Sequence, residues 1–254
     1  MYKNSINKSH IKYFLYNFYI FLLFIILYAS FNWAKLKNSV KTQSIIFSET
    51  KVLNVDIYKQ LVNYVPIKRM DDIDIINLNK VIEAHPYVKA ARISNHYPNK
   101  ILIEIIEREP LAILKVNPII MIDDDGFILP DLGHHINYDI PILTNFNVKE
   151  GDYSSGIKTK SGKVIECVKW LNKIKENYIY LYENLSELKI TSSDDIELIL
   201  FDYPTYVYLG QNKINSRLNI LKEFGNTIKP KKISDYTYLD MRYKNQIVVK
   251  EKQS

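Results

Sequence analysis

The chain of 254 residues is long enough for one large or two small domains, and its 47% apolar content is typical of a folded protein. Its net charge of +6 comes from residues 1–41, which hold six lysines and no acid, so the rest of the chain is neutral. A nucleic-acid-binding domain would carry such an excess itself, so the charge pattern argues against nucleic acid as a partner. The single cysteine, Cys167, excludes an intrachain disulfide, and its helical context predicts a buried apolar residue rather than a nucleophile.

Residues 13–34 contain no charged side chain, and as a helix they would span about 33 Å, enough for a bilayer core of about 30 Å. Aromatic residues gather near both ends of this segment, as they do at membrane interfaces. Its length, with Tyr28 and Asn32 where a cleavage site would need small residues, favours an uncleaved anchor over a signal peptide. Lysines flank both ends equally, so orientation rests on the ordinary arrangement, in which a short tail stays cytoplasmic and a long domain is translocated.

A basic linker, residues 35–41, precedes a pattern that predicts a small α+β unit. Residues 43–47 read as a strand, and apolar residues at helical spacing predict two helices, 55–65 and 76–85. Two runs rich in β-formers follow at 88–93 and 100–108, which predict a hairpin. Pro86 and Pro110 bound the hairpin and Pro98 lies in its turn. The order strand, helix, helix, strand, strand suits two helices on one face of a three-stranded sheet.

Short strands are predicted at 111–116 and 118–122, and Asp125-Gly126 is a hairpin turn signal. Asp123, Asp124 and Asp125 lack the spaced ligands and closing glutamate of a calcium loop, so a turn is favoured over a metal site. The adjacent His134 and His135 would point to opposite faces of an extended chain and are interpreted as a surface loop. The sequence therefore predicts no metal site and no cofactor.

A polar connection over residues 151–162 leads into a second structured region. An amphipathic helix is predicted over 163–177, with one apolar face formed by Val164, Cys167, Val168, Leu171 and Ile174. Strands at 185–190, 195–200 and 206–210 read as a meander, and a further amphipathic helix covers 214–228. Two final strands, 235–243 and 245–250, meet at a tight turn at Lys244-Asn245.

Five sequence patterns in this order, behind a single anchor, resemble the FtsQ family of bacterial cell-division proteins, called DivIB in some bacteria. They are HPYVKAARISNHYPNKILIEIIEREP, IDDDGFIL, DIPIL, VYLGQNKINSRLNIL and YLDMRYKNQIVVK. The resemblance implies an α+β protein with a cytoplasmic tail (1–12), a transmembrane helix (13–34), a linker (35–41), a POTRA domain (42–110), a mixed or antiparallel β-domain with flanking helices (111–250) and a C-terminal tail (251–254).

The resemblance also implies a non-enzymatic scaffold, single-pass in the inner membrane, with its C-terminal domain outside the cytoplasm at the division septum. Its expected partners are the FtsB and FtsL coiled-coil proteins, bound by β-augmentation at the last strands, where the complex helps control septal peptidoglycan synthesis. Carried over by position, the partner-binding residues would be Arg242, Tyr243, Val248, Val249 and Lys250. A tryptophan that some members carry after this motif is absent here.

In the POTRA part, Pro98, Arg108 and Pro110 are predicted to set the shape of the hairpin, and the domain is expected to dock other membrane division proteins. No small-molecule substrate is expected. Two alternatives stay open: another POTRA-type envelope assembly adaptor, and an anchored envelope hydrolase using acids such as Glu104, Glu107 or Asp123. None of those acids forms a catalytic motif.

Overall fold

The computed structural model describes residues 8–38, 44–63, 74–96, 100–131, 139–146, 153–201 and 204–252. It begins with α1 (Lys8–Asn38). Among the described helices, α1 alone is long and apolar enough to cross a membrane, over the 24 residues Lys12–Lys35. At 1.5 Å per residue this segment measures about 36 Å, and it contains the predicted span 13–34.

The first sheet has three strands and follows the predicted order of elements, which are β1 (Ser44–Phe47), α2 (Val55–Asn63), α3 (Ile75–Glu83), β2 (Val88–His96) and β3 (Lys100–Glu107). Its strand order is β1-β3-β2, with β1 parallel to β3. Apolar side chains of the helices and of β3 are buried, among them Tyr58, Leu78, Ile101 and Ile103. Pro98 lies outside the described residues.

The second sheet has nine strands in the order β12-β11-β10-β9-β8-β7-β4-β5-β6. Its strands are β4 (Pro110–Leu114), β5 (Ile120–Asp123), β6 (Ile128–Pro130), β7 (Ile142–Thr144), β8 (Leu185–Ile190), β9 (Ile196–Leu200), β10 (Thr205–Gly210), β11 (Tyr236–Asp240) and β12 (Val248–Glu251). The predicted meander β8–β9–β10 is antiparallel. β10 and β11 run parallel, and β11 and β12 form the closing antiparallel pair.

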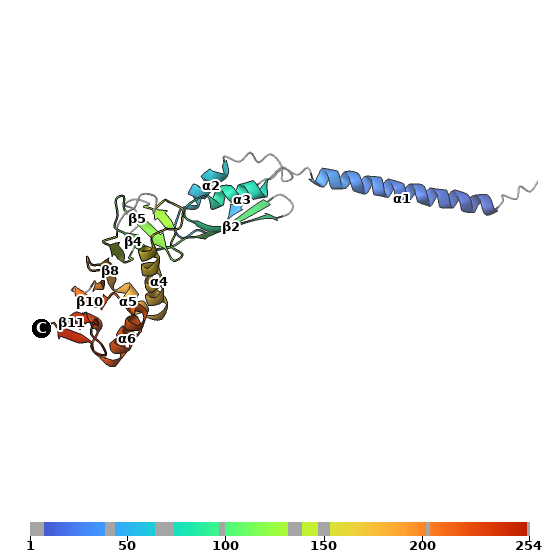
Figure 1. The fold of residues 1–254 in the computed structure, drawn as a ribbon. Coiled ribbons are helices and arrows are strands. Elements are labelled where there is room, and N and C mark those ends of the chain that lie inside the picture. The colour runs from blue at the N-terminus through green and yellow to red at the C-terminus, as the bar shows by residue number, and fades with distance from the viewer. Residues whose placement is uncertain are drawn as a thin grey trace, which may run out of the picture. The chain divides into compact units, whose positions relative to one another are not determined.

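Helices α4 (Gly162–Asn177), α5 (Ile179–Glu183) and α6 (Ile214–Thr227) lie along this sheet (Figure 1), and a 3-10 turn, η2 (Ile233–Asp235), precedes β11. The buried residues of α4 are the five that the sequence pattern placed on one face: Val164, Cys167, Val168, Leu171 and Ile174. They join a single core with buried residues of the strands and of α6. The predicted fold class, α+β with an apolar helix, a small sheet and a larger mixed sheet, is therefore confirmed.

Packing divides the chain into two units, each continuous in space but not in sequence. One contains Met1–Glu49, Val55–Val81 and Ala91–Ile105, and the other contains Thr50–Asn54, Ile82–Ala90 and Ile106–Ser254. The domain boundaries derived from the family resemblance stay a prediction.

Candidate functional site

The last strand, β12, is an open edge of the nine-stranded sheet. In the described part of the chain, its only hydrogen-bonded neighbour is β11. All four of its residues are exposed, including Val248 and Val249 at 37% each. An edge strand with one free side presents a row of backbone groups that another strand can pair with.

The opposite edge of the same sheet is covered. The outer side of β6 is bonded to the segment before α4: Ile128 N–H donates to the Ile157 carbonyl at 3.0 Å, and Gly156 N–H donates to the Ile128 carbonyl at 2.8 Å. Pro130, the last residue of β6, has no N–H to offer. The two ends of the sheet therefore differ, and β12 is the end open to a partner.

The register of β11 and β12 assigns each exposed residue to a face of the sheet. Val249 lies opposite Leu239, whose side chain is fully buried in the core, so Val249 extends the apolar face that the helices cover. Val248 and Lys250 lie opposite Asp240 and Tyr238 and belong to the other face. A strand added beside β12 would meet a valine on each face.

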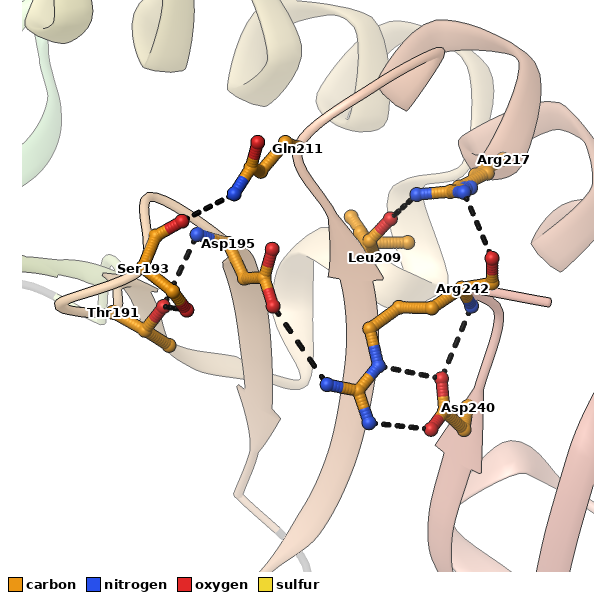
Figure 2. A network of polar contacts seen from close by, with 8 residues as sticks. All are labelled: Thr191, Ser193, Asp195, Leu209, Gln211, Arg217, Asp240 and Arg242. Carbon is orange, nitrogen blue, oxygen red and sulfur yellow. Dashed lines mark hydrogen bonds and ion pairs between the residues drawn. The ribbon is translucent and has the colours of Figure 1, made fainter.

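Arg242 is exposed, but its guanidinium is bound by acidic side chains of the protein (Figure 2). Its Nε donates to Asp240 Oδ1 at 2.9 Å and its Nη2 to Asp240 Oδ2 at 2.6 Å. Its Nη1 lies 3.7 Å from Asp195 Oδ2, and its guanidinium lies 5.2 Å from the centre of the Tyr208 ring. These hydrogen bonds lower the pKa of the Asp240 carboxyl and raise that of Arg242. About half of the Arg242 side chain stays exposed, so part of the guanidinium remains accessible to a partner although it also binds Asp240.

A second arginine holds the chain just after β11 in place (Figure 2). Arg217 of α6 donates from Nη1 to the Leu209 carbonyl and from Nη2 to the Arg242 carbonyl, the latter at 3.2 Å. Gly210 makes this possible: its φ is +70°, and a Cβ there would lie 2.7 Å from Arg217 Nη1 and 3.1 Å from Arg242 Cγ. Gly210, which belongs to the pattern VYLGQNKINSRLNIL, thus leaves space for both arginines.

Tyr243 follows Arg242 at the start of the turn into β12 and is 54% exposed. The turn lies at Lys244-Asn245 as predicted, with Asn245 at φ 60°, a left-handed conformation that asparagine tolerates well. The connection is longer than the predicted tight turn, because β11 ends at Asp240 and β12 begins at Val248. Tyr243, Val248, Val249 and Lys250 are therefore all exposed at one end of the sheet. Arg242 adjoins them but is also bound to Asp240.

Three tyrosines that sequence reasoning did not single out lie beside this edge. Tyr208 is 6.3 Å from Tyr206 and 6.2 Å from Tyr238, measured between ring centres, on the face that carries Lys250. Burial is the main cause that raises the pKa of the Tyr208 phenol. The alternation of tyrosine with buried Thr205, Val207 and Leu209 was the available signal, because period-two alternation puts the tyrosines on one face.

Of the three predicted shape-setting residues, the structure describes two. Arg108 Nη1 donates to Asp123 Oδ2 at 2.7 Å, and its guanidinium lies 3.6 Å from the centre of the Phe127 ring. Pro110 is buried and opens β4, opposite Asp123. Their role in setting shape is consistent with these contacts and stays a prediction.

The acids considered for metal binding or hydrolysis have structural partners. Asp123, Asp124 and Asp125 place carboxylate oxygens within 4.8 Å of one another, but the Asp123 carboxylate also accepts the N–H groups of Asp125 and Phe127. Glu107 accepts the N–H groups of residues 51–53. Glu104 lies 3.8 Å from Arg92. His134 and His135 lie outside the described residues.

Comparison with known proteins agrees with this architecture. Residues 109–250 match the family described as FtsQ/DivIB, C-terminal related. The chain is similar to the cell division protein FtsQ of Syntrophotalea carbinolica, 22% identical over 70% of this chain and 62% of that protein. It is also similar to FtsQ of Geotalea daltonii, 21% identical over 83% of this chain and 76% of that protein. FtsQ of Haemophilus influenzae is 26% identical over 87% of this chain and 83% of that protein.

The match to the Syntrophotalea protein spans less than two thirds of that relative's length. The family description, however, covers more than half of the present chain and all of the strands from β4 to β11. The five sequence patterns, the larger sheet and these relatives agree, and the chain belongs to the FtsQ/DivIB family of cell-division proteins.

Proposed function

We propose that this protein is a membrane-anchored, non-enzymatic scaffold of the bacterial division machinery that recruits a partner strand at β12. The partner class is the one that the family resemblance implies, the FtsB and FtsL coiled-coil proteins, and the complex helps control septal peptidoglycan synthesis. The observation that carries the proposal is the difference between the two sheet edges: β6 is covered by residues 156–157, and β12 is open.

The side chains at the edge support recognition as well as pairing. The backbone of β12 supplies hydrogen bonds to an added strand, and Val248 and Val249 offer one apolar contact on each face. Tyr243 and Arg242 are of the residue types that dominate binding energy in interfaces. Because Arg242 is already bound to Asp240, we assign it a mixed role: it positions the turn and presents its exposed half to the partner.

The remaining parts of the proposal concern placement in the cell. The helix over Lys12–Lys35 anchors the chain in the cytoplasmic membrane, its N-terminus faces the cytoplasm, and the sheets lie outside at the septum. The three-stranded unit is a POTRA domain, residues 42–110, that docks other membrane division proteins, and the β-domain covers 111–250.

Site-specific photocrosslinking in dividing cells tests the β12 proposal. A photoreactive phenylalanine analogue is placed at Val248, Val249 or Lys250, which belong to β12, and at Ile119 and Phe201 as exposed controls on the same unit. We expect crosslinks to small single-span coiled-coil proteins from the β12 positions and not from the controls. Membrane fractions show by immunoblot that all variants accumulate equally.

Crosslinks to those proteins from Ile119 or Phe201 but not from β12 would mean that the chain is a division scaffold with another docking surface. Crosslinks to envelope assembly or wall-degrading proteins in their place would contradict the proposed partner class.

A further inference from the structure

An open pocket of about 320 Å³ lies on the larger unit. It is formed by the junction between α4 and α5, the end of α6 and the segment that follows α6. Lys229, Lys231 and Lys232 line it from the segment after α6. Tyr178 and Tyr180 line it from the start of α5, and Ile233 contributes a side chain that is itself 2% exposed. We call this the Tyr–Lys pocket, and no part of it belongs to the β12 edge.

The aromatic side of the pocket is built into the fold. A Cβ at Gly225 of α6 would lie 2.4 Å from the Tyr178 hydroxyl, so glycine is required for that ring to pack against the helix. The rings of Tyr178 and Tyr180 are tilted, with centres 6.5 Å apart. Burial raises the pKa of the Tyr178 phenol, which is in any case uncharged at neutral pH. The pocket thus has an apolar base and an aromatic wall.

On the basic side of the pocket, one of the three lysines is paired with an acid of the protein. Lys231 pairs with Glu251 of β12 at 2.6 Å, which ties the segment to the sheet. Neither Lys229 nor Lys232 forms an ion pair with any acid in the described part of the chain, and both are exposed. Residues 211–254 hold 10 basic against 4 acidic side chains, so this part of the chain carries a net positive charge, to which the three lysines of the pocket contribute.

We propose that the Tyr–Lys pocket binds an acidic segment of a protein partner, one that carries carboxylates next to an aliphatic or aromatic side chain. The lysines attract the carboxylates, while Tyr178, Tyr180 and Ile233 receive the apolar side chain. A peptide combines both features within a few residues, which a free inorganic anion does not. The inference goes beyond docking at β12 and does not depend on it.

Fluorescence anisotropy on the full-length protein in detergent micelles tests this inference. The probe is a short labelled peptide of alternating glutamate and leucine, and its matched control carries glutamine at every glutamate. The test variant is Lys229→Glu/Lys232→Glu, which leaves the Lys231–Glu251 pair in place. The control variant, Lys115→Glu/Lys169→Glu, makes the same charge change at exposed lysines outside the pocket.

We expect the glutamate peptide to bind the wild-type protein and the test variant to lose roughly tenfold in affinity, because two attractions become repulsions. The control variant should change less than about twofold. Tyr180→Ala, which removes part of the aromatic wall at a partly exposed site, should weaken binding of both peptides.

Three results would overturn the inference. Equal binding by wild type and test variant would exclude the pocket, and equal losses in both double variants would show that only net charge matters. Binding to phosphatidylglycerol vesicles that the test variant abolishes, with no binding of the peptide, would assign the lysines to lipid headgroups. The β12 crosslinks test a different surface, so either proposal can fail alone.

Discussion

Asp240 receives both the side chain and the backbone of Arg242: Oδ1 accepts Nε at 2.9 Å and the peptide N–H at 3.0 Å, while Oδ2 accepts Nη2 at 2.6 Å. Asp240 is 6% exposed, so its charge depends on this partner. We expect Asp240→Asn to lower the free energy of unfolding by about 1–3 kcal/mol. Urea unfolding of the full chain in micelles measures the change. Glu223→Gln, at an exposed site on α6, is the control and should leave the midpoint unchanged.

The Arg242–Asp240 pair should also make the free energy of unfolding depend on pH. Hydrogen bonds from Arg242 hold the pKa of Asp240 below its usual value of 3.8. The folded state therefore favours the charged carboxylate, and this stabilisation is complete above the unfolded-state pKa and disappears as pH falls through the folded-state pKa. The stability difference between wild type and Asp240→Asn should be full at neutral pH and shrink below about pH 4. A difference that grows on acidification would contradict this assignment.

The ion pair of Arg108 with Asp123 predicts a larger loss. Asp123 is fully buried, and besides Arg108 it binds two backbone N–H groups of its own turn. Asp123→Ala removes the acceptor of two backbone N–H groups and leaves Arg108 with the longer contact to Asp125 at 3.9 Å, and it should cost about 3–5 kcal/mol. Asp124→Ala, next to it and exposed, should cost less than about 1 kcal/mol. Similar losses for the two, measured by thermal unfolding, would mean that the pair does not stabilise the turn.

The sequence predicted those parts of the fold whose signal is local. The apolar face of α4, the strands of the meander and the turn at Asn245 follow from spacing within one element. The three-residue strand β7 and the five-residue helix α5 were not predicted, because neither is long enough to show a period. The parallel pairing of β10 with β11 depends on residues about 30 positions apart.

The same distinction between what the sequence can and cannot predict holds for the candidate site. The resemblance located the five edge residues Arg242, Tyr243, Val248, Val249 and Lys250, and all five are exposed in the structure. It could not indicate that Arg242 binds Asp240, nor that Arg217 reaches the Arg242 carbonyl. The Arg217 contact depends on how α6 packs against the sheet, which no single segment encodes. Asp240 and Arg242 are only two residues apart, but their contact depends on how the chain bends after β11.

Glu107 supplies a prediction about a loop far from it in sequence. Its carboxylate accepts the N–H groups of Lys51, Val52 and Leu53, the first at 2.5 Å. Glu107→Ala should speed amide hydrogen exchange at residues 51–53 and cost about 1–3 kcal/mol. Glu107→Gln keeps one carbonyl acceptor and should show an intermediate effect. Unchanged exchange at these amides in Glu107→Ala would show that other contacts hold the loop.

Cys167 should be unreactive in the folded protein. It is fully buried in α4, and burial raises the pKa of its thiol, so the thiolate needed for alkylation is scarce. Iodoacetamide labelling at mildly alkaline pH should be slow until urea unfolds the larger unit, and mass spectrometry measures the modified fraction. Rapid labelling without denaturant would mean that α4 opens locally.

We expect substitution of an exposed residue at the β12 end to weaken partner binding without changing the stability of the fold. Tyr243 is 54% exposed, so Tyr243→Ala should change the free energy of unfolding by less than about 0.5 kcal/mol. If Tyr243 contacts the partner as proposed, the same variant should lower partner capture about fivefold or more, since a tyrosine at an interface often contributes over 1 kcal/mol. Co-purification from crosslinked cells measures capture, and chemical unfolding measures stability.

Phe201→Ala is the matched control for Tyr243→Ala, because it also removes an exposed aromatic ring, 68% exposed at the end of β9. It should leave capture unchanged. Val249→Asp should reduce partner capture more than Tyr243→Ala does. It places a charge on the apolar face beside Leu239, where an added strand would pack. If Tyr243→Ala and Phe201→Ala recover the partner equally while Val249→Asp does not, pairing at β12 stands and the aromatic contact does not. If all three recover it equally, partner binding lies elsewhere on the protein.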